Sequence, residues 1–148
     1  MTKTFLIQSH ELAQLVQHFK FLASCFVLNF NNYVFTHAVG GLFDRFLAKL
    51  YKITSTSVFE SIEDLIDLHS EALDEILGAC LLRSGLKSTA KYLHNILDTI
   101  LHAGLLIHDL YRGCIPEVSA TTKIKPLLAS FIHNKNSLVC FFLENDSF

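Results

Sequence analysis

The stretch that decides the fold is FVLNFNNYVFTHAVGGLF, residues 26–43, which contains no residue that is charged at neutral pH. The uncharged segment extends further, because no Lys, Arg, Asp or Glu occurs between Lys20 and Asp44. A transmembrane helix needs about 20 mostly apolar residues, so residues 21–43 are long enough to cross a bilayer. The alternative is a helix that is buried among other helices of the same protein.

Two features favour the buried helix. A membrane span would place Asn29, Asn31, Asn32 and His37 in lipid, where unpaired polar groups are costly. Apolar residues also recur every three or four positions, and the pattern begins upstream in the charged region 10–20. This stripe consists of Leu12, Leu15, Val16, Phe19, Leu22, Phe26, Phe30 and Tyr33. We therefore expect a long helix that is buried on most sides, with its asparagines on the less apolar flank.

The composition leaves more apolar material than one small core needs. Of the 148 residues, 51% are hydrophobic and only 18% are charged, below the roughly 25% typical of soluble domains. Such an excess indicates a partner surface, a membrane, or a piece of a larger protein. The net charge is −2 and no basic stripe is present, so we expect no nucleic-acid partner. The apolar run near the N-terminus is too short for the core of a signal peptide.

Further helices follow from the same spacing rule. Gly40 and Gly41 indicate a bend in the first helix, and Ser57 with Glu60, or Ser61 with Asp64, fits a capping box before the second. The second helix carries an apolar stripe of Ile62, Leu65, Ile66, His69, Leu73, Ile76, Leu77 and Cys80, opposite an acidic face. Gly85 is a candidate to close it. A third helix runs from about Leu86 to Tyr111.

The remainder is harder to assign. Residues 112–124 are rich in Gly, Pro, Ser and Thr, which predicts a linker to a short terminal segment. A short fourth helix is expected to start near Lys125 and Pro126. The end, 136–148, is apolar and compatible with a strand, and we leave it unassigned. The predicted fold is all-α: a bundle of about four to five helices with one long, bent first helix.

No residue pattern points to catalysis, a cofactor or a metal. His94, Asp98 and His102 share a helix face, but they span about 12 Å of helical rise, which is too far for one ion. His69 lies in an apolar stripe, where a histidine is usually a hydrogen-bonded core residue; the other interpretation is a role at a protein interface. The cysteines (Cys25, Cys80, Cys114 and Cys140) lack paired spacing, so we expect reduced thiols, mostly packed as small apolar groups, instead of a zinc site. We expect a protein that is not an enzyme.

An ordered set of residues resembles a known family. The succession NNYVFTHAVGGLFDRFLAKL, then IEDLIDLHSEALDEILGACLLRSG, is similar to the C-terminal region of the γ-tubulin complex components, the Spc97/Spc98 family. The matching positions are Tyr33, Asp64-Leu65-Ile66 with His69, Leu73-Asp74 and Cys80-Leu81-Leu82. Ala38 stands where the family usually has Val, Phe43 stands where it has Trp, and the loop before Asp64 is longer than usual. The pattern most resembles the fifth-component subtype.

The resemblance implies a non-catalytic subunit that binds γ-tubulin and supports microtubule nucleation. The implied partners are γ-tubulin and other γ-tubulin complex components, and the implied location is the cytoplasm and cytoskeleton, at a centrosome or spindle pole. The chain, 1–148, would correspond to the distal part of the γ-tubulin-binding helical domain. The family-signature residues Tyr33, Phe43, His69, Leu73 and Cys80 are expected to be structural.

The acidic face of the second helix is the candidate partner surface. It consists of Glu63, Asp64, Asp67, Glu71 and Asp74, and its other interpretation is a solvated face. Two rival functions stay open from sequence alone: a small membrane-associated helical protein that uses residues 21–43, and a metal-dependent helical enzyme that uses the His94 face.

Overall fold

The computed structural model describes residues 7–56, 62–82 and 87–145, with side chains described for 7–52, 62–82 and 87–143. The helical elements are α1 (His10–Asn32), η1 (Tyr33–Gly41), α2 (Leu42–Thr56), α3 (Ile62–Ala79), α4 (Lys87–Tyr111) and α5 (Glu117–Asn145). These described ranges contain no strand, so the all-α prediction is confirmed. The predicted capping boxes and Gly85 lie wholly or partly outside the described residues.

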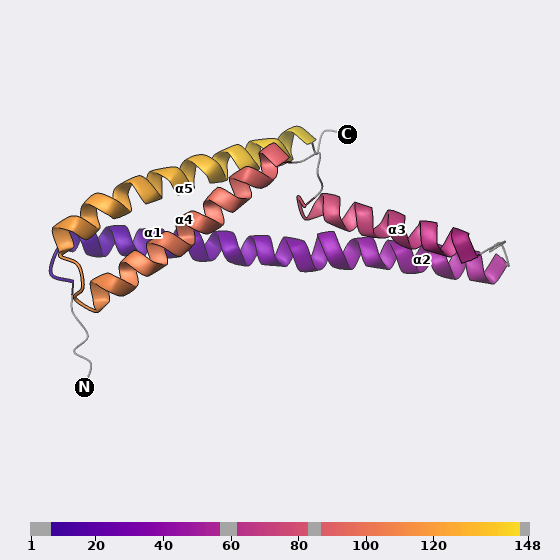
Figure 1. The fold of residues 1–148 in the computed structure, drawn as a ribbon, viewed down its shortest axis with the longest axis horizontal. Helices are drawn as coiled ribbons and strands as arrows, with labels where there is room; N and C mark the ends of the chain where they lie inside the picture. The colour runs from indigo at the N-terminus through magenta and orange to yellow at the C-terminus, as the bar shows by residue number, and fades with distance from the viewer. Residues whose placement is uncertain (1–6, 57–61, 83–86, 146–148) are drawn as a thin grey trace. The chain divides into compact units, whose positions relative to one another are not determined.

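The long first helix is confirmed. The chain stays helical without interruption through α1, η1 and α2, from His10 to Thr56 (Figure 1). Gly40 and Gly41, where we expected a bend, do not end the helix. They are the last two residues of η1, a π-helix, in which hydrogen bonds join residues five positions apart.

The chain divides into two compact units, Met1–Phe26 with Ser88–Phe148 (unit 1) and Val27–Lys87 (unit 2). In unit 1 the start of α1 packs against α4 and α5. One buried cluster joins the three helices, and it consists of Leu12, Val16, Ile107, Leu110, Ala120 and Ile124. Phe131 of α5 is fully buried, and its ring lies 5.6 Å from that of Phe19 and 6.0 Å from that of Phe26. The predicted stripe of α1 is therefore the core face of unit 1.

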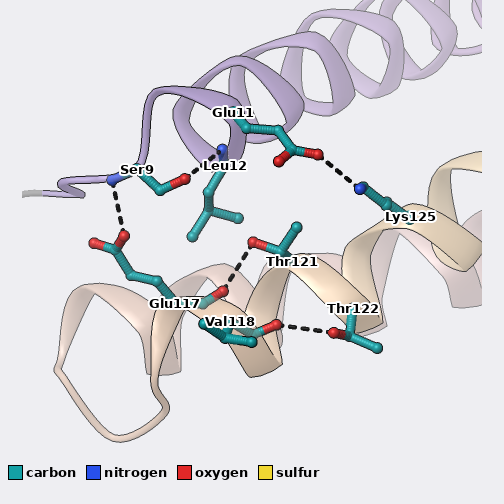
Figure 2. Close-up of polar contacts among 8 residues, drawn as sticks. All are labelled: Ser9, Glu11, Leu12, Glu117, Val118, Thr121, Thr122 and Lys125. Atoms are coloured by element: carbon teal, nitrogen blue, oxygen red, sulfur yellow. Dashed lines mark hydrogen bonds and ion pairs between the residues drawn. The ribbon is translucent and has the colours of Figure 1, made fainter.

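Polar contacts fix the N-terminus of α1 to that of α5 (Figure 2). The carboxylate of Glu117 accepts hydrogen bonds from the backbone N–H groups of Gln8 (2.7 Å) and Ser9 (2.8 Å). The Oγ of Ser9 accepts one from the N–H of Leu12 at 3.3 Å, as an N-cap side chain does. The Nζ of Lys125 lies 2.6 Å from Oε1 of Glu11. A negative charge at a helix N-terminus also complements the helix dipole.

The predicted start of the last helix is wrong. We expected a linker over 112–124 and a short helix from about Pro126, whereas α5 begins at Glu117 and continues to Asn145. Residues 138–143, which looked compatible with a strand, are helical, and Leu138 is buried. The connection between α4 and α5 is therefore only 112–116.

Unit 2 is built by η1 and α2, which pack against α3. Among its described side chains, the buried hydrophobic residues are Ala38, Leu42 and Leu81. The hydroxyl of Tyr33 donates a 3.0 Å hydrogen bond to the carbonyl oxygen of Ala79, the last residue of α3. The described core of unit 2 is thus small, and the side-chain hydrogen bond of Tyr33 joins the start of η1 to the end of α3.

The end of α3 has an unusual backbone. The N–H of Leu82 donates to the carbonyl of Leu77 (2.8 Å) and that of Leu81 to Gly78 (3.0 Å), which is the Schellman pattern. Leu81 stands at the left-handed position of this motif, with φ 61°, where glycine is usual. The end of α4 has the same two bonds, and there Gly113, with φ 71°, takes the left-handed position.

The uncharged segment 21–43 is buried on one face only, so our expectation of burial on most sides is wrong. Phe21, Leu28 and Phe35 follow one another at seven-residue spacing and are 65–68% exposed. They lie on the side of the helix opposite Phe19, Ala23 and the rest of the core stripe. The spacing correctly identified the packed face, but a second apolar stripe on the same helix stays uncovered.

Candidate functional site

The acidic residues singled out from sequence all lie on α3. Glu63, Asp64, Asp67, Glu71 and Asp74 are exposed. Oε2 of Glu71 lies 3.5 Å from Nζ of Lys49 on α2, and both side chains are about half exposed, so this ion pair is a weak surface contact. The helix contains no Lys or Arg, so all of its side chains that are charged at neutral pH are acidic.

Most of the predicted apolar stripe of α3 is exposed, contrary to our expectation of a core face; only Ile76 and Cys80 of that stripe are half-buried. No residue of α3 is buried. Its half-buried residues are Leu68, Ala72, Ile76, Gly78 and Ala79, and α3 packs on α2 and η1. By contrast, the four residues that we call the α3 ridge are 43–74% exposed: Ile62, Ile66, Leu73 and Leu77.

Helical geometry places the ridge beside the acidic residues. Residues three, four and seven positions apart share a helix face, which aligns the α3 ridge along one line. Glu63, Asp67 and Asp74 each follow a ridge residue by one position, so they form a parallel line, the acidic row, on its flank. An apolar line with an acidic flank suits a protein partner that offers apolar side chains beside Lys or Arg. The sequence displayed this stripe, but periodicity alone does not tell whether the same chain or a partner covers it.

Two of the five signature residues, Tyr33 and Cys80, lie at one end of unit 2. Tyr33 is half-buried and bonds to Ala79, next to the half-buried Cys80. Burial raises the pKa of the Cys80 thiol above its ordinary value, which suits a packed thiol better than a reactive one. Leu81, between Cys80 and Leu82 of the signature, is 3% exposed and carries the left-handed backbone. Its backbone role could not be read from the sequence.

Three other signature residues lie at the surface. His69 is exposed, so the interpretation as a core histidine is wrong, and its ring packs edge-on against Phe46 at 6.0 Å. Phe43, where the resemblance has Trp, is 49% exposed, and its ring lies 5.9 Å from that of Phe46. Leu73 belongs to the α3 ridge and is 47% exposed.

Neither of the metal arrangements considered from sequence is assembled. His94, Asp98 and His102 are exposed along α4, and the described residues contain no group of three metal-binding side chains close enough for one ion. All four cysteines are free; Cys114 and Cys140 are exposed, so the expectation of packed thiols is wrong for these two. Within residues 7–56, 62–82 and 87–145, no helix is long and apolar enough to cross a bilayer.

Comparisons with known proteins bear on almost the whole chain. No curated protein and no solved structure matches it significantly. The model of one protein family, described as "Gamma tubulin complex component C-terminal", matches residues 1–142. That range includes all of unit 2, most of unit 1 and the signature residues from Tyr33 to Leu82. The chain therefore belongs to the γ-tubulin complex component family, through the C-terminal region of that family.

Proposed function

We propose that this chain is a non-catalytic subunit of the γ-tubulin complex, which binds γ-tubulin and supports microtubule nucleation. The observation that carries the proposal is the family match over residues 1–142. Its setting would be the cytoplasm and cytoskeleton at a microtubule organising centre, and its partners γ-tubulin and other components of the complex. The chain would act as the distal part of the γ-tubulin-binding domain.

The α3 ridge and the acidic residues beside it are the proposed partner-binding surface. The side chains of the α3 ridge are 43–74% exposed, so a partner could bury their apolar area on binding. The acidic residues Glu63, Asp64, Asp67, Glu71 and Asp74 would select a basic surface and speed the encounter. Scaffolding of this kind needs no reacting group, because nucleation by a template depends on where the bound subunits are held. A preformed helical surface also avoids the cost of ordering a flexible one.

Capture of purified γ-tubulin by the immobilised chain tests the proposal. We expect binding at low ionic strength that weakens as salt is added, since screening at 0.15 M salt reaches about 8 Å. The double variant Asp67→Asn/Asp74→Asn removes two charges of the acidic row, and we expect it to bind less and to lose most of the salt dependence. Failure of the parent chain to retain γ-tubulin at low salt would contradict the proposal.

A matched control separates the surface from total charge. Asp98→Asn/Asp109→Asn removes the same number and type of charges from exposed positions of α4. We expect this control to bind like the parent chain. Equal loss in both double variants would place the binding surface elsewhere while leaving γ-tubulin as the partner. A second comparison tests the exposed apolar residues. We expect Ile66→Ser/Leu73→Ser, on the α3 ridge, to weaken γ-tubulin binding, and Leu101→Ser/Leu105→Ser, on α4, to leave it unchanged.

A further inference from the structure

The π-helical segment η1 interrupts an otherwise regular helix over nine residues, Tyr33–Gly41. π-Helices are rare, they usually last a single turn, and they concentrate at functional sites. A stretch this long is therefore a feature that the sequence must specifically permit. No part of the proposed partner surface on α3 accounts for it.

Gly40 is the residue that permits the π form. A Cβ at position 40 would lie 2.8 Å from the carbonyl oxygen of Phe35, which is a backbone atom and cannot move aside cheaply. That carbonyl belongs to the residue five positions earlier, the one that π geometry places beneath residue 40. An α-helix would place the carbonyl of Thr36 there instead. At Gly41 a Cβ would meet the carbonyl oxygen of Thr36 at an ordinary 3.6 Å.

A second contact ties the start of η1 to α3. Tyr33, the first residue of η1, donates its hydroxyl to the carbonyl of Ala79 at 3.0 Å. Because α3 packs on both η1 and α2, and α2 follows η1, we expect a change of helical form in η1 to alter the position of α3 relative to Tyr33. The bond from Tyr33 to Ala79 therefore holds η1 in the π form from its N-terminal end, while Gly40 makes that form sterically possible.

We propose that residues 33–41 are a register switch, π-helical in this structure and able to convert to α-helix. A π turn takes in more residues than an α turn, so nine residues complete fewer turns. Conversion to α-helix adds rotation to everything that follows, and α2 with α3 turns relative to Val27–Asn32. Each backbone N–H exchanges one carbonyl partner for the next, so the two forms keep similar hydrogen bonding. This inference does not depend on the identity of the partner.

Distances between two spin labels in the full chain test the switch. The labels are attached at Asn29→Cys, before η1, and at Asp67→Cys on α3, with the four native cysteines replaced by Ala. Asn29 and Asp67 are both exposed in unit 2. Pulsed electron paramagnetic resonance then reports the distance distribution. We expect a main distance in this parent chain and, in Gly40→Ala, a shift of the main population to a different distance.

Three further variants decide the outcome. Gly41→Ala adds a methyl group where it fits, and Gly104→Ala adds one to α4 in open space, so both should keep the parent distribution. Tyr33→Phe removes only the hydroxyl and should raise the population at the distance that Gly40→Ala favours. If Gly40→Ala does not fold, Tyr33→Phe alone tests whether η1 converts between the two helical forms. The switch is refuted if Gly40→Ala folds with the parent distribution, or if Tyr33→Phe leaves it unchanged when Gly40→Ala cannot be measured.

Discussion

Leu81 shows how one residue can carry opposing contributions. Its side chain is 3% exposed, which stabilises unit 2, whereas its backbone has the left-handed conformation that costs a non-glycine residue about 1–2 kcal/mol. The same Schellman motif at the end of α4 avoids this cost with Gly113. The burial of Leu81 therefore outweighs its strain, and the two can be separated by substitution.

We predict that Leu81→Gly is more stable than Leu81→Ala. Both variants lose the buried side chain, at about 2–5 kcal/mol, but only glycine relieves the left-handed strain. Allowing for glycine's larger loss of chain entropy, the difference should be about 1 kcal/mol in favour of Gly. Chemical denaturation of both variants measures it. Ala72→Gly, inside α3, should show the ordinary opposite sign, and a more stable Leu81→Ala would refute the argument.

Glu117 and Glu11 form a second instructive pair at this scale. The carboxylate of Glu117 accepts hydrogen bonds from two backbone N–H groups. The carboxylate of Glu11 instead forms an ion pair with Lys125, and both of these side chains are largely exposed. We predict that Glu117→Gln lowers the free energy of unfolding by about 1–3 kcal/mol, since hydrogen bonds to a charged acceptor are the stronger kind. Glu11→Gln should cost less than about 1 kcal/mol. Equal losses in urea denaturation would contradict this ranking.

At the scale of elements, the sequence predicted a helix well where an apolar stripe was long and its end was marked. The third helix was predicted to end near Tyr111, which is the last residue of α4, and Gly113 marks that end. The last helix was misplaced because its first turns are rich in Thr and Ser. In the structure, Thr121 and Thr122 donate their hydroxyls to the carbonyls four residues earlier, Glu117 and Val118, which keeps these side chains compatible with a helix (Figure 2).

Pro126 also contributed to the wrong prediction of where the last helix starts. A proline usually stands in the first turn of a helix, and we used it as a start signal. Here it lies inside α5. Its missing N–H leaves the carbonyl of Thr122 without its usual helical partner, but Thr122 is exposed, so water can satisfy that group. Local signals could not decide this case; the packing of Ala120 and Ile124 in the core did.

The early start of α5 has a direct test. Ile124 is 1% exposed although it precedes the helix start that the sequence suggested, whereas Val118 of the same helix is 79% exposed. We predict that Ile124→Ala lowers the free energy of unfolding by about 2–5 kcal/mol, as expected for a large buried aliphatic side chain. Val118→Ala should change it by no more than about 0.5 kcal/mol. If both substitutions have similarly small effects on thermal and urea unfolding, residues 117–124 do not pack as part of a helix and the predicted linker would be correct.

The candidate site was only half visible in the sequence. The acidic side chains of α3 are exposed, as both a solvated face and a partner-binding face require. This exposure was predictable, because charged side chains are rarely buried without an oppositely charged or hydrogen-bonding partner. The α3 ridge was placed in the core because spacing identifies an apolar face without saying what covers it. Likewise, the left-handed Leu81 and the bond from Tyr33 to Ala79 arise from tertiary geometry that no local pattern encodes.

At the scale of the whole molecule, burial is unevenly divided between the two units. Of the side chains that the structure describes, unit 1 holds an extended core that reaches from Leu12 to Phe131 and Leu138, whereas the buried hydrophobic residues in unit 2 are Ala38, Leu42 and Leu81. Helical stability in proteins comes mainly from packing an amphipathic face. Unit 2 should therefore open more readily than unit 1.

Amide hydrogen exchange followed by mass spectrometry measures this difference. We predict that amides in the middle of α3 exchange faster than those of α4 between Ile96 and Ile107, because local opening needs less energy where few apolar contacts break. Bound γ-tubulin should slow exchange in α3 if the proposed surface is correct. Equal protection of α3 and α4 in the free chain would show that the two units unfold as one.

The contact between Glu117 and the start of α1 also constrains how the protein is made. The carboxylate and the N–H groups of Gln8 and Ser9 are 109 and 108 residues apart in the chain. During synthesis, α1 leaves the ribosome long before the residue that completes its N-terminus. Until α4 and α5 have been synthesised, the apolar face of α1 has no helix of unit 1 to pack against. We therefore expect chaperones to bind the nascent chain at α1 for longer than at α4 or α5.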